Sequence, residues 1–288
     1  MPKILRRERL VPNIHVLEVE APEVAAKAQA GQFVMVMPDE RGERIPLTIA
    51  DWDRKAGSVT VVFMMVGTTS HKLAGLKAGD EIPVFVGPLG KPAEVGSYGS
   101  VLCAGGCFGI AAIHPIARAM KEAGNKVTVL IDVKASYLLY WEDKLRKVSD
   151  RFLVSARDPH FSSKEYVPHK VRSLLDGPDK PGRVVAIGCT YLMSSVSEAT
   201  RAAGVRTMVA LNPIMVDGTG MCGACRCTVG GKPKFACVDG PEFDGHAVDW
   251  GEVFFRRKSY VEDEMKSLCV WERGRLGPES VEEVPQGV

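Results

Sequence analysis

The sequence has 288 residues, of which 45% are hydrophobic and 25% are charged, and 37 basic against 35 acidic side chains give a net charge of +2. This composition is typical of a folded globular protein of about two domains, and it excludes a disordered chain, a collagen and a bare coiled coil. The near-neutral charge gives no reason to expect a nucleic acid or an anionic membrane as partner.

The chain contains eight cysteines, and whether they form disulfides depends on whether the compartment is oxidising or reducing. Residues 1–9 (MPKILRRER) are followed by polar sequence and not by the apolar core of a secretory signal, so we expect the reducing cytoplasm. Clustered cysteines in that compartment indicate metal or redox chemistry. Residues 101–117 carry no Asp, Glu, Lys or Arg, but they include His114, Pro115 and three glycines and are too short to span a membrane.

Residues 1–98 have the pattern of short strands. Apolar and polar residues alternate, and Gly, Pro and Asp separate the runs. Only residues 70–76 have a helical pattern. Short strands at this spacing predict an antiparallel β-barrel or sandwich, and we expect the barrel. The expected strands are residues 13–20, 32–37, 45–49, 58–66 and 81–86.

The pattern changes near residues 97–100, and residues 99–212 form the second expected domain. Apolar strands alternate here with helical stretches, which predicts a doubly wound parallel sheet. The expected strands are residues 101–104, 126–132, 152–156, 184–188 and 208–211. The first expected helix runs from the glycines at 105–109 to residue 121, and the others cover residues 138–148, 169–175 and 191–203.

Two further segments complete the expected organisation. Residues 213–250 hold four of the eight cysteines and many glycines, and such a stretch needs a metal or another cross-link to become ordered. Residues 251–288 form a tail that looks helical over residues 253–271. Its apolar side chains either pack on the rest of the chain, which we favour, or form an exposed patch for a partner. These side chains are Phe254, Phe255, Tyr260, Met265 and Leu268.

The cysteine-rich segment DGTGMCGACRCTVGGKPKFAC (residues 217–237) has the spacing of an iron–sulfur site. Plant-type [2Fe–2S] sites use C-x4-C-x2-C…C, and the chain keeps this spacing with Asp217 in the first place, followed by Cys222, Cys225 and Cys237. Glycines between these residues let the backbone wrap a cluster. The alternatives are a zinc ion, with Cys227 or Asp217 as fourth ligand, and reduced thiols without metal.

Because a carboxylate oxygen is a harder donor than a thiolate, we further expect Asp217 to raise the reduction potential of the cluster relative to an all-cysteine site.

A glycine-rich turn follows the first strand of the second domain. The sequence AGGCFG (residues 104–109) lets backbone N–H groups approach a pyrophosphate at the start of a helix, although it is not the full G-x-G-x-x-G pattern. Asp132 either accepts a hydrogen bond from a ribose hydroxyl, which favours NAD over NADP, or caps a turn. A second strand ends at Gly188 and Cys189. Cys107 and Cys189 either line a site or, more commonly for cysteine, lie in the core.

Five short blocks of sequence resemble ferredoxin–NADP reductase-like proteins. RIPLT (residues 44–48) is similar to their flavin-binding R-x-Y-S/T signature, although Arg44 is one residue further from Thr48 and Leu47 replaces the aromatic residue. GTTS (residues 67–70) resembles their flavin-pyrophosphate turn, GPLG (residues 87–90) the end of their barrel, and residues 104–110 and 186–193 their two nicotinamide-side loops.

With the cluster segment, the resemblance narrows to the electron-transfer subunits that include the dihydroorotate dehydrogenase B subunit. The Asp-first run at residues 212–244 is most similar to small subunits of NADH-dependent ferredoxin:NADP oxidoreductases, also called sulfide dehydrogenase beta subunits.

This resemblance implies three cofactors, FAD between barrel and sheet, NAD(H) over the flavin, and a [2Fe–2S] cluster. It implies a larger partner subunit, similar to the glutamate synthase small subunit, with further flavin and [4Fe–4S] centres and with ferredoxin as its own partner. The implied cluster ligands are Asp217, Cys222, Cys225 and Cys237. The implied FAD- and NAD-binding residues are Arg44, Pro46, Leu47, Thr48, Met65, Val66, Gly67, Thr68, Thr69, Ser70, Gly105, Gly106, Gly109, Ile110, Asp132, Gly188 and Cys189.

These parts predict an electron-transfer enzyme subunit, because a flavin is needed between a two-electron donor and a one-electron acceptor. We expect no acid–base dyad and no covalent nucleophile. His114 is expected to be structural, and His71 and His246 to lie at the surface or in turns. A subunit of the dihydroorotate dehydrogenase B type and a zinc-stabilised binding protein without turnover remain the alternatives.

Overall fold

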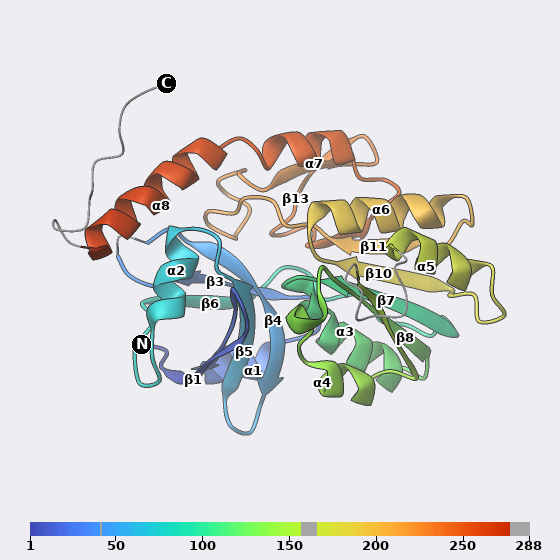
Figure 1. Cartoon of the computed structure of the whole chain (residues 1–288), viewed down its shortest axis with the longest axis horizontal. Coiled ribbons are helices and arrows are strands. Elements are labelled where there is room, and N and C mark those ends of the chain that lie inside the picture. Colours follow the sequence, from blue (N-terminus) through green and yellow to red (C-terminus); the bar gives the residue numbers. More distant parts are fainter. Residues whose placement is uncertain (41, 157–165, 277–288) are drawn as a thin grey trace.

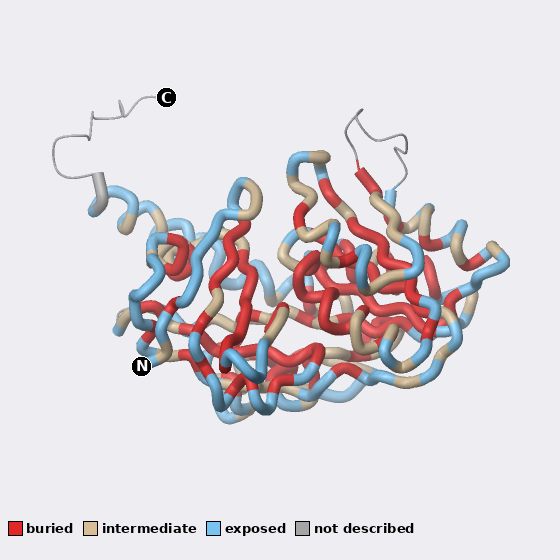
Figure 2. Tube along the Cα trace, turned by 90° about the horizontal axis from the view of Figure 1, so that it is seen from below, coloured by how far each residue is buried: buried red, intermediate tan, exposed pale blue. Residues whose placement is uncertain are grey.

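The computed structural model describes residues 1–40, 42–156 and 166–276. These residues form two six-stranded sheets and one two-stranded sheet. In Figure 1 the first sheet curls into a barrel beside the second sheet, and the C-terminal segment runs across the top of both. Figure 2 shows the buried residues gathered in the interior of these two parts, with exposed residues around them. The expected class, a barrel followed by an α/β domain and a small C-terminal segment, is confirmed.

The barrel has the strand order β1-β2-β5-β4-β3-β6, with every neighbouring pair antiparallel. A bridge between Lys3 and Glu81 brings the first strand back toward the last. The first strand was not predicted, because its sequence ILRRERLV is charged on both faces and shows no alternation. The elements are β1 (Ile4–Val11), β2 (Ile14–Glu20), α1 (Pro22–Lys27), β3 (Phe33–Met37), β4 (Ile45–Asp53), β5 (Ser58–Met64), α2 (Thr68–Gly75) and β6 (Val84–Leu89).

The second sheet has the order β14-β11-β10-β7-β8-β9, and β7 to β11 are parallel. The domain begins with β7 in the middle of this sheet, and β8 and β9 add on one side of it, whereas β10 and β11 add on the other. The switch point therefore lies between β7 and β10, where such sheets bind ligands. The expected helix at 138–148 is shorter, since Trp141 has a left-handed backbone (φ 56°). The elements are β7 (Ser100–Gly106), α3 (Gly109–Glu122), β8 (Lys126–Val133), η1 (Ser136–Leu138), α4 (Glu142–Lys147), β9 (Arg151–Ala156), α5 (Val167–Leu175), β10 (Arg183–Ile187), α6 (Thr190–Arg201) and β11 (Thr207–Ala210).

The C-terminal segment adds a hairpin, an edge strand and two helices. The edge strand β14 pairs antiparallel with β11, so the second sheet is mixed and not wholly parallel. The tail forms two helices, with a break at residues 257–260. The elements are β12 (Arg226–Val229), β13 (Lys232–Phe235), β14 (Glu242–Asp244), α7 (Trp250–Arg256) and α8 (Val261–Leu276).

The barrel, the sheet domain and the C-terminal segment share buried surface. Phe33 and Met35 of the barrel belong to the same apolar cluster as Cys225 and Cys237 of the C-terminal segment and Leu102 of the sheet. We propose the division 1–98, 99–212, 213–250 and 251–288, of which residues 277–288 lie outside the described part. Among the described residues, no helix combines the length and the apolar character needed to cross a membrane.

Candidate functional site

The cysteine-rich segment forms a tight loop held by three left-handed glycines. Gly218, Gly220 and Gly223 have φ values of 77°, 87° and 69°. A Cβ atom on Gly218 would lie 2.7 Å from Cγ of Met35 in β3, so the loop rests directly on the barrel only because this residue is glycine. These conformations suit the expected wrapping of the loop around a cluster.

The four expected ligands lie in two pairs. The Asp217 Oδ2 atom accepts the Cys222 N–H at 2.8 Å, and its carboxylate also lies within hydrogen-bond reach of the Cys222 side chain. The Sγ atoms of Cys225 and Cys237 lie 3.2 Å apart. Because four ligands share two irons in a [2Fe–2S] cluster, two pairs of donors fit that group.

A zinc ion would need its donors around one point. Within residues 1–40, 42–156 and 166–276, no three His, Cys, Asp or Glu side chains are gathered in that way. Cys227, the other candidate zinc ligand, is buried and directs its thiol to the Lys234 carbonyl oxygen at 3.7 Å. The two pairs of donors suit a two-iron cluster, and iron analysis separates it from zinc.

The two pairs differ in their surroundings. Cys225 and Cys237 are buried, whereas Cys222 is exposed. Burial and the neighbouring Cys225 raise the pKa of Cys237 to about 12, so two thiolates at this distance need a nearby positive charge. The backbone N–H of Thr219 keeps the pKa of Asp217 below its usual value, so this carboxyl is already an anion. The donor set is suited to a cationic iron–sulfur centre.

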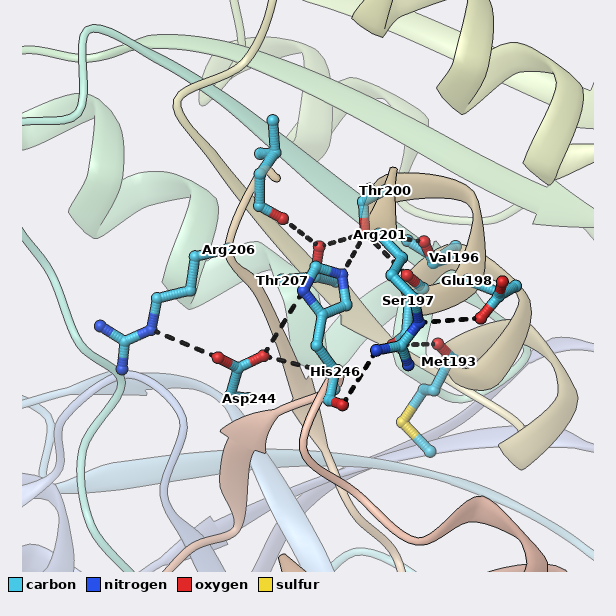
Figure 3. A network of polar contacts seen from close by, with 12 residues as sticks. Met193, Val196, Ser197, Glu198, Thr200, Arg201, Arg206, Thr207, Asp244 and His246 are labelled. Carbon is cyan, nitrogen blue, oxygen red and sulfur yellow. Dashed lines mark hydrogen bonds and ion pairs between the residues drawn. The ribbon is translucent and has the colours of Figure 1, made fainter. Parts of the chain in front are cut away.

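A polar network anchors the chain that follows the cluster loop (Figure 3). The His246 Nε2 atom lies 2.9 Å from Thr200 Oγ1 on α6, and Arg201 donates to the His246 carbonyl oxygen at 3.2 Å. Asp244 Oδ1 accepts the His246 N–H at 3.0 Å. His246 therefore holds the turn after β14 against the sheet domain. Its role is structural, and it lies in a turn as expected.

Glycines bring the two strand ends at the switch point into direct backbone contact. A Cβ on Gly109 would collide with the Ile187 carbonyl oxygen and lie 2.9 Å from Cα of Gly188. A Cβ on Gly188 would lie 2.9 Å from the Gly106 carbonyl oxygen, and one on Gly105 would lie 3.0 Å from the Gly109 carbonyl oxygen. The two expected nicotinamide loops are therefore adjacent, and α3 starts at their junction, where its first N–H groups favour an anion.

Cys107 and Cys189 are both exposed at this junction, so the interpretation of these residues as core cysteines is wrong. Cys107 adopts a left-handed conformation (φ 54°), and Tyr140 donates to its carbonyl oxygen at 2.8 Å. Tyr140 was not predicted as a site residue, because it lies 33 residues from Cys107 in the sequence and only the fold brings the two together. Asp132 lies beside Gly106 in the neighbouring strand, while the side chain of Ile110 is buried in the core.

The expected flavin turn is a hydrogen-bonded start of α2. Ser70 Oγ accepts the N–H groups of Val66 and Gly67 at 2.8 and 2.9 Å. Thr69 Oγ1 accepts the N–H of Glu43 at 3.2 Å and so ties the turn to the segment before β4. The first backbone N–H groups of α2, from Thr68 onward, have no partner within the helix, as at helix starts that bind anions.

The remaining expected flavin residues are divided between surface and core. Arg44 is exposed and Pro46 and Thr48 are half-buried, whereas Leu47 points into the barrel core, so only its backbone can reach a ligand. Val66 is 63% exposed, and Met65 is half-buried.

His114 joins the barrel to the sheet domain. It is buried, and its Nδ1 lies 3.3 Å from the Ala50 carbonyl oxygen of β4. Asp51, the next residue, pairs with Arg118 at 2.9 Å and with Lys144 at 3.3 Å. Burial lowers the pKa of His114. The expected structural role fits these contacts, and His71, half-buried with its Nδ1 2.9 Å from the Gly67 carbonyl oxygen, belongs to the flavin turn.

Much of the tail is exposed, so the favoured packing of its apolar residues on the chain is wrong for four of the five. Phe254, Phe255, Tyr260 and Met265 are 37%, 76%, 57% and 62% exposed, while Leu268 is half-buried. Helix α8 touches the rest of the chain at α2, where Ser267 Oγ lies 2.9 Å from Thr68 Oγ1 and Trp271 lies against His71 (Figure 1).

Comparison with known proteins gives three kinds of match. Residues 212–249 match the family model of the iron-sulfur cluster binding domain of dihydroorotate dehydrogenase B. A Thermotoga maritima protein named dihydroorotate dehydrogenase B (NAD(+)), electron transfer subunit homolog, is 42% identical over 262 residues, 91% of this chain and 92% of the relative. The electron transfer subunit of dihydroorotate dehydrogenase B from Desulforamulus reducens is 26% identical over 256 residues, 86% of this chain and 97% of the relative.

Among solved structures, a chain of an NADH-dependent reduced ferredoxin–NADP oxidoreductase, studied for flavin-based electron bifurcation, superposes with a TM-score of 0.89. The two chains are 40% identical, and the match covers 95% of this chain and 98% of that one. Phthalate dioxygenase reductase superposes with a TM-score of 0.55 at 16% identity, covering 80% and 86%, and shares the fold.

Proposed function

Because the chain belongs to the family of the dihydroorotate dehydrogenase B electron transfer subunits, we propose that it passes electrons between NAD(H), FAD and a [2Fe–2S] cluster to a larger partner subunit. It is an oxidoreductase subunit, and its chemistry lies in the bound groups. When bound, the flavin exchanges electrons in pairs with NAD(H) and singly with the cluster.

The protein holds these groups close together. The loop of Asp217, Cys222, Cys225 and Cys237 would hold the irons, and it rests on Met35 of the barrel. The start of α2 at Gly67 would hold the flavin pyrophosphate. The glycine junction at the end of β7 and β10 would hold the nicotinamide nucleotide at the switch point. Each position follows from backbone N–H groups or thiols, and none needs an acid–base residue.

One observation carries the proposal, namely the two pairs of donors in the loop. They supply one carboxylate and three thiols in the order and spacing of a two-iron site, beside a barrel and a sheet of the flavin-reductase fold. A protein with this loop but without iron would have no acceptor for single electrons.

We propose the NADH-dependent ferredoxin:NADP oxidoreductase type of subunit, with the dihydroorotate dehydrogenase B type as the alternative. Both are supported, because the chain is 40% identical to the solved oxidoreductase chain and 42% identical to the Thermotoga maritima relative named for dihydroorotate dehydrogenase B. An assay of the native complex separates the two. Ferredoxin- and NADP-dependent turnover with NADH supports the first type, and dihydroorotate-dependent reduction of NAD supports the second.

The larger partner is proposed to bind at the exposed tail residues Phe255, Tyr260 and Met265. We propose a flavin- and [4Fe–4S]-containing subunit similar to the glutamate synthase small subunit, which in turn reduces or oxidises ferredoxin. The eight thiols, all free of disulfides, suit a reducing compartment such as the cytoplasm. Replacing Phe255 and Met265 by Ser should abolish co-purification of the partner, whereas Lys266→Ser should not.

The function is tested on protein purified without oxygen. Iron, acid-labile sulfide and flavin should be present at about two, two and one per chain, and NADH should bleach the colour. A colourless protein with one zinc ion would instead support the binding protein without turnover.

A further inference from the structure

A cavity of about 730 Å³ lies between the β1–β2 hairpin and α2. Its size falls in the range of small-molecule sites. Strands β1 and β2 supply one wall and the second half of α2 with the residues after it supplies the other. The lining residues that bear on its chemistry are Arg7, Arg9, His15, Met65, His71 and Lys77.

The polar lining of this cavity is basic. Arg7, Arg9 and Lys77 bring three cations, and His15 and His71 bring two imidazoles. No Asp or Glu is among the described residues that line it. Arg7 donates to the Ala74 carbonyl oxygen at the end of α2, which leaves part of its guanidinium for a ligand. In contrast, Arg6 on the same strand is paired with Glu8 and Glu18 at 3.4 and 3.7 Å.

His15 is the feature that points to a ligand. Its side chain is 3% exposed and stacks on Phe63, with ring centroids 5.8 Å apart. Neither ring nitrogen has a hydrogen-bond partner among the described residues, although both are buried. A buried polar group without a partner is costly, and an acceptor inside the cavity would remove that cost by taking the ring N–H.

The cavity lies next to the proposed flavin turn, with which its lining shares Met65 and His71. Successive residues of a strand point to opposite faces, so Phe63, the stacking partner of His15, and Met64 point apart. Met64 packs against the core shared with the sheet domain. His15 therefore lies on the face of the barrel wall that is turned away from the sheet domain.

We propose that this cavity binds a small phosphate-bearing anion, held by Arg7, Arg9 and Lys77 and by an N–H donated from His15. Guanidinium groups hold phosphate oxygens in pairs of hydrogen bonds, and the apolar lining at Met65 leaves room for a larger organic part. His71, which contacts the Gly67 carbonyl oxygen, places the ligand one helical turn from the flavin turn.

The test uses the full chain loaded with flavin and titrated calorimetrically with inorganic pyrophosphate. Binding should saturate with a Kd at or below about 1 mM, and Arg9→Gln should weaken it about tenfold or more. His15→Phe fills the same space without an N–H and should weaken binding to a similar extent while the protein stays folded. Arg6→Gln removes an equal charge from the opposite face of β1 and should leave binding unchanged.

Two results would overturn the proposal. One is the absence of saturable binding to the wild-type chain, and the other is equal binding by the wild type, Arg9→Gln and His15→Phe. Flavin content is measured before the titration, so that failure of the cavity proposal can be distinguished from failure of the proposed electron-transfer function. A chain without flavin contradicts the electron-transfer function, while the effect of Arg9→Gln on pyrophosphate binding still decides the cavity.

Discussion

The Sγ atoms of Cys225 and Cys237 lie 3.2 Å apart and are buried, although eleven residues separate them in the sequence. The hairpin β12–β13 produces this contact, because it turns the chain back so that the Ala236 N–H donates to the Cys225 carbonyl oxygen at 3.2 Å. Two thiols meet at the base of a hairpin, and the carboxylate of Asp217 accepts the N–H of Cys222. The account of function depends on this arrangement of donors.

Replacing Cys237 by Ser should remove most iron and sulfide from the protein, because one iron loses a thiolate ligand. Cys227→Ser is the matched control, since Cys227 is also buried in the same segment but points to the Lys234 carbonyl oxygen. It should keep the iron and sulfide content of the wild type. Equal loss of metal in both variants would contradict the assignment of ligands.

Asp217→Cys should lower the reduction potential of the cluster, since a thiolate donates more electron density to iron than a carboxylate. The midpoint is measured by redox titration of the cluster signal. Asp239→Asn is the control, because Asp239 caps the nearby Phe235 N–H without lying in a ligand pair. An unchanged or higher midpoint in Asp217→Cys would show that Asp217 does not tune the cluster as proposed.

Gly109→Ala should destabilise the fold by about 2–3 kcal/mol and raise the KM for NADH, because the new Cβ collides with the Ile187 carbonyl oxygen and separates the two loops. Gly274→Ala, on α8 with open space around it, should change the free energy of unfolding by less than about 1 kcal/mol. Thermal unfolding and NADH kinetics provide the two measurements. Wild-type values for Gly109→Ala would rule out close contact at the switch point.

The stability of the wild-type protein should fall as the pH drops below about 6.5. Burial lowers the pKa of His114 in the folded state below its ordinary value of 6.5, so the unfolded chain takes up the proton first. The stabilisation is complete above pH 6.5 and is lost as the pH falls toward the folded pKa. His114→Gln keeps a donor for the Ala50 carbonyl oxygen but does not titrate, so its unfolding free energy should depend less on pH.

The control for this prediction is His169→Gln, which changes an exposed histidine on α5. Denaturant unfolding between pH 5.5 and 7.5 measures both variants, with equilibrium midpoints compared at each pH. If the unfolding free energy of His114→Gln depends on pH as steeply as that of the wild type, the protonation of His114 does not cause the loss of stability at low pH. His15, whose pKa burial also lowers, leaves some slope in either case.

Local sequence patterns were sufficient for most of the fold. The parallel strands were predicted because each is a continuous apolar run, and the cluster loop was predicted because its donors and glycines lie within one short segment. The family resemblance drawn from the same segment is confirmed by the 42% identical relative. In each case the signal is carried by residues adjacent in sequence.

Features that depend on distant contacts could not be predicted. Strand β14 has three residues and forms because Phe243 meets Val209 of β11. The hydrogen bond from Tyr140 to the left-handed Cys107 joins residues 33 apart in the sequence, and the basic cavity depends on α2 folding over β1 and β2. The individual flavin and nicotinamide contacts remain predictions. Leu47 and Ile110, two of the residues predicted to make them, have buried side chains.

The most direct test of the central claim is the metal and sulfide content of the protein purified without oxygen, followed by spectroscopy after NADH addition. The account predicts two irons bridged by sulfide in the loop of Asp217, Cys222, Cys225 and Cys237, and a cluster signal that NADH reduces through the bound flavin. A single tetrahedral ion in that loop, or a cluster that NADH leaves oxidised, would contradict it.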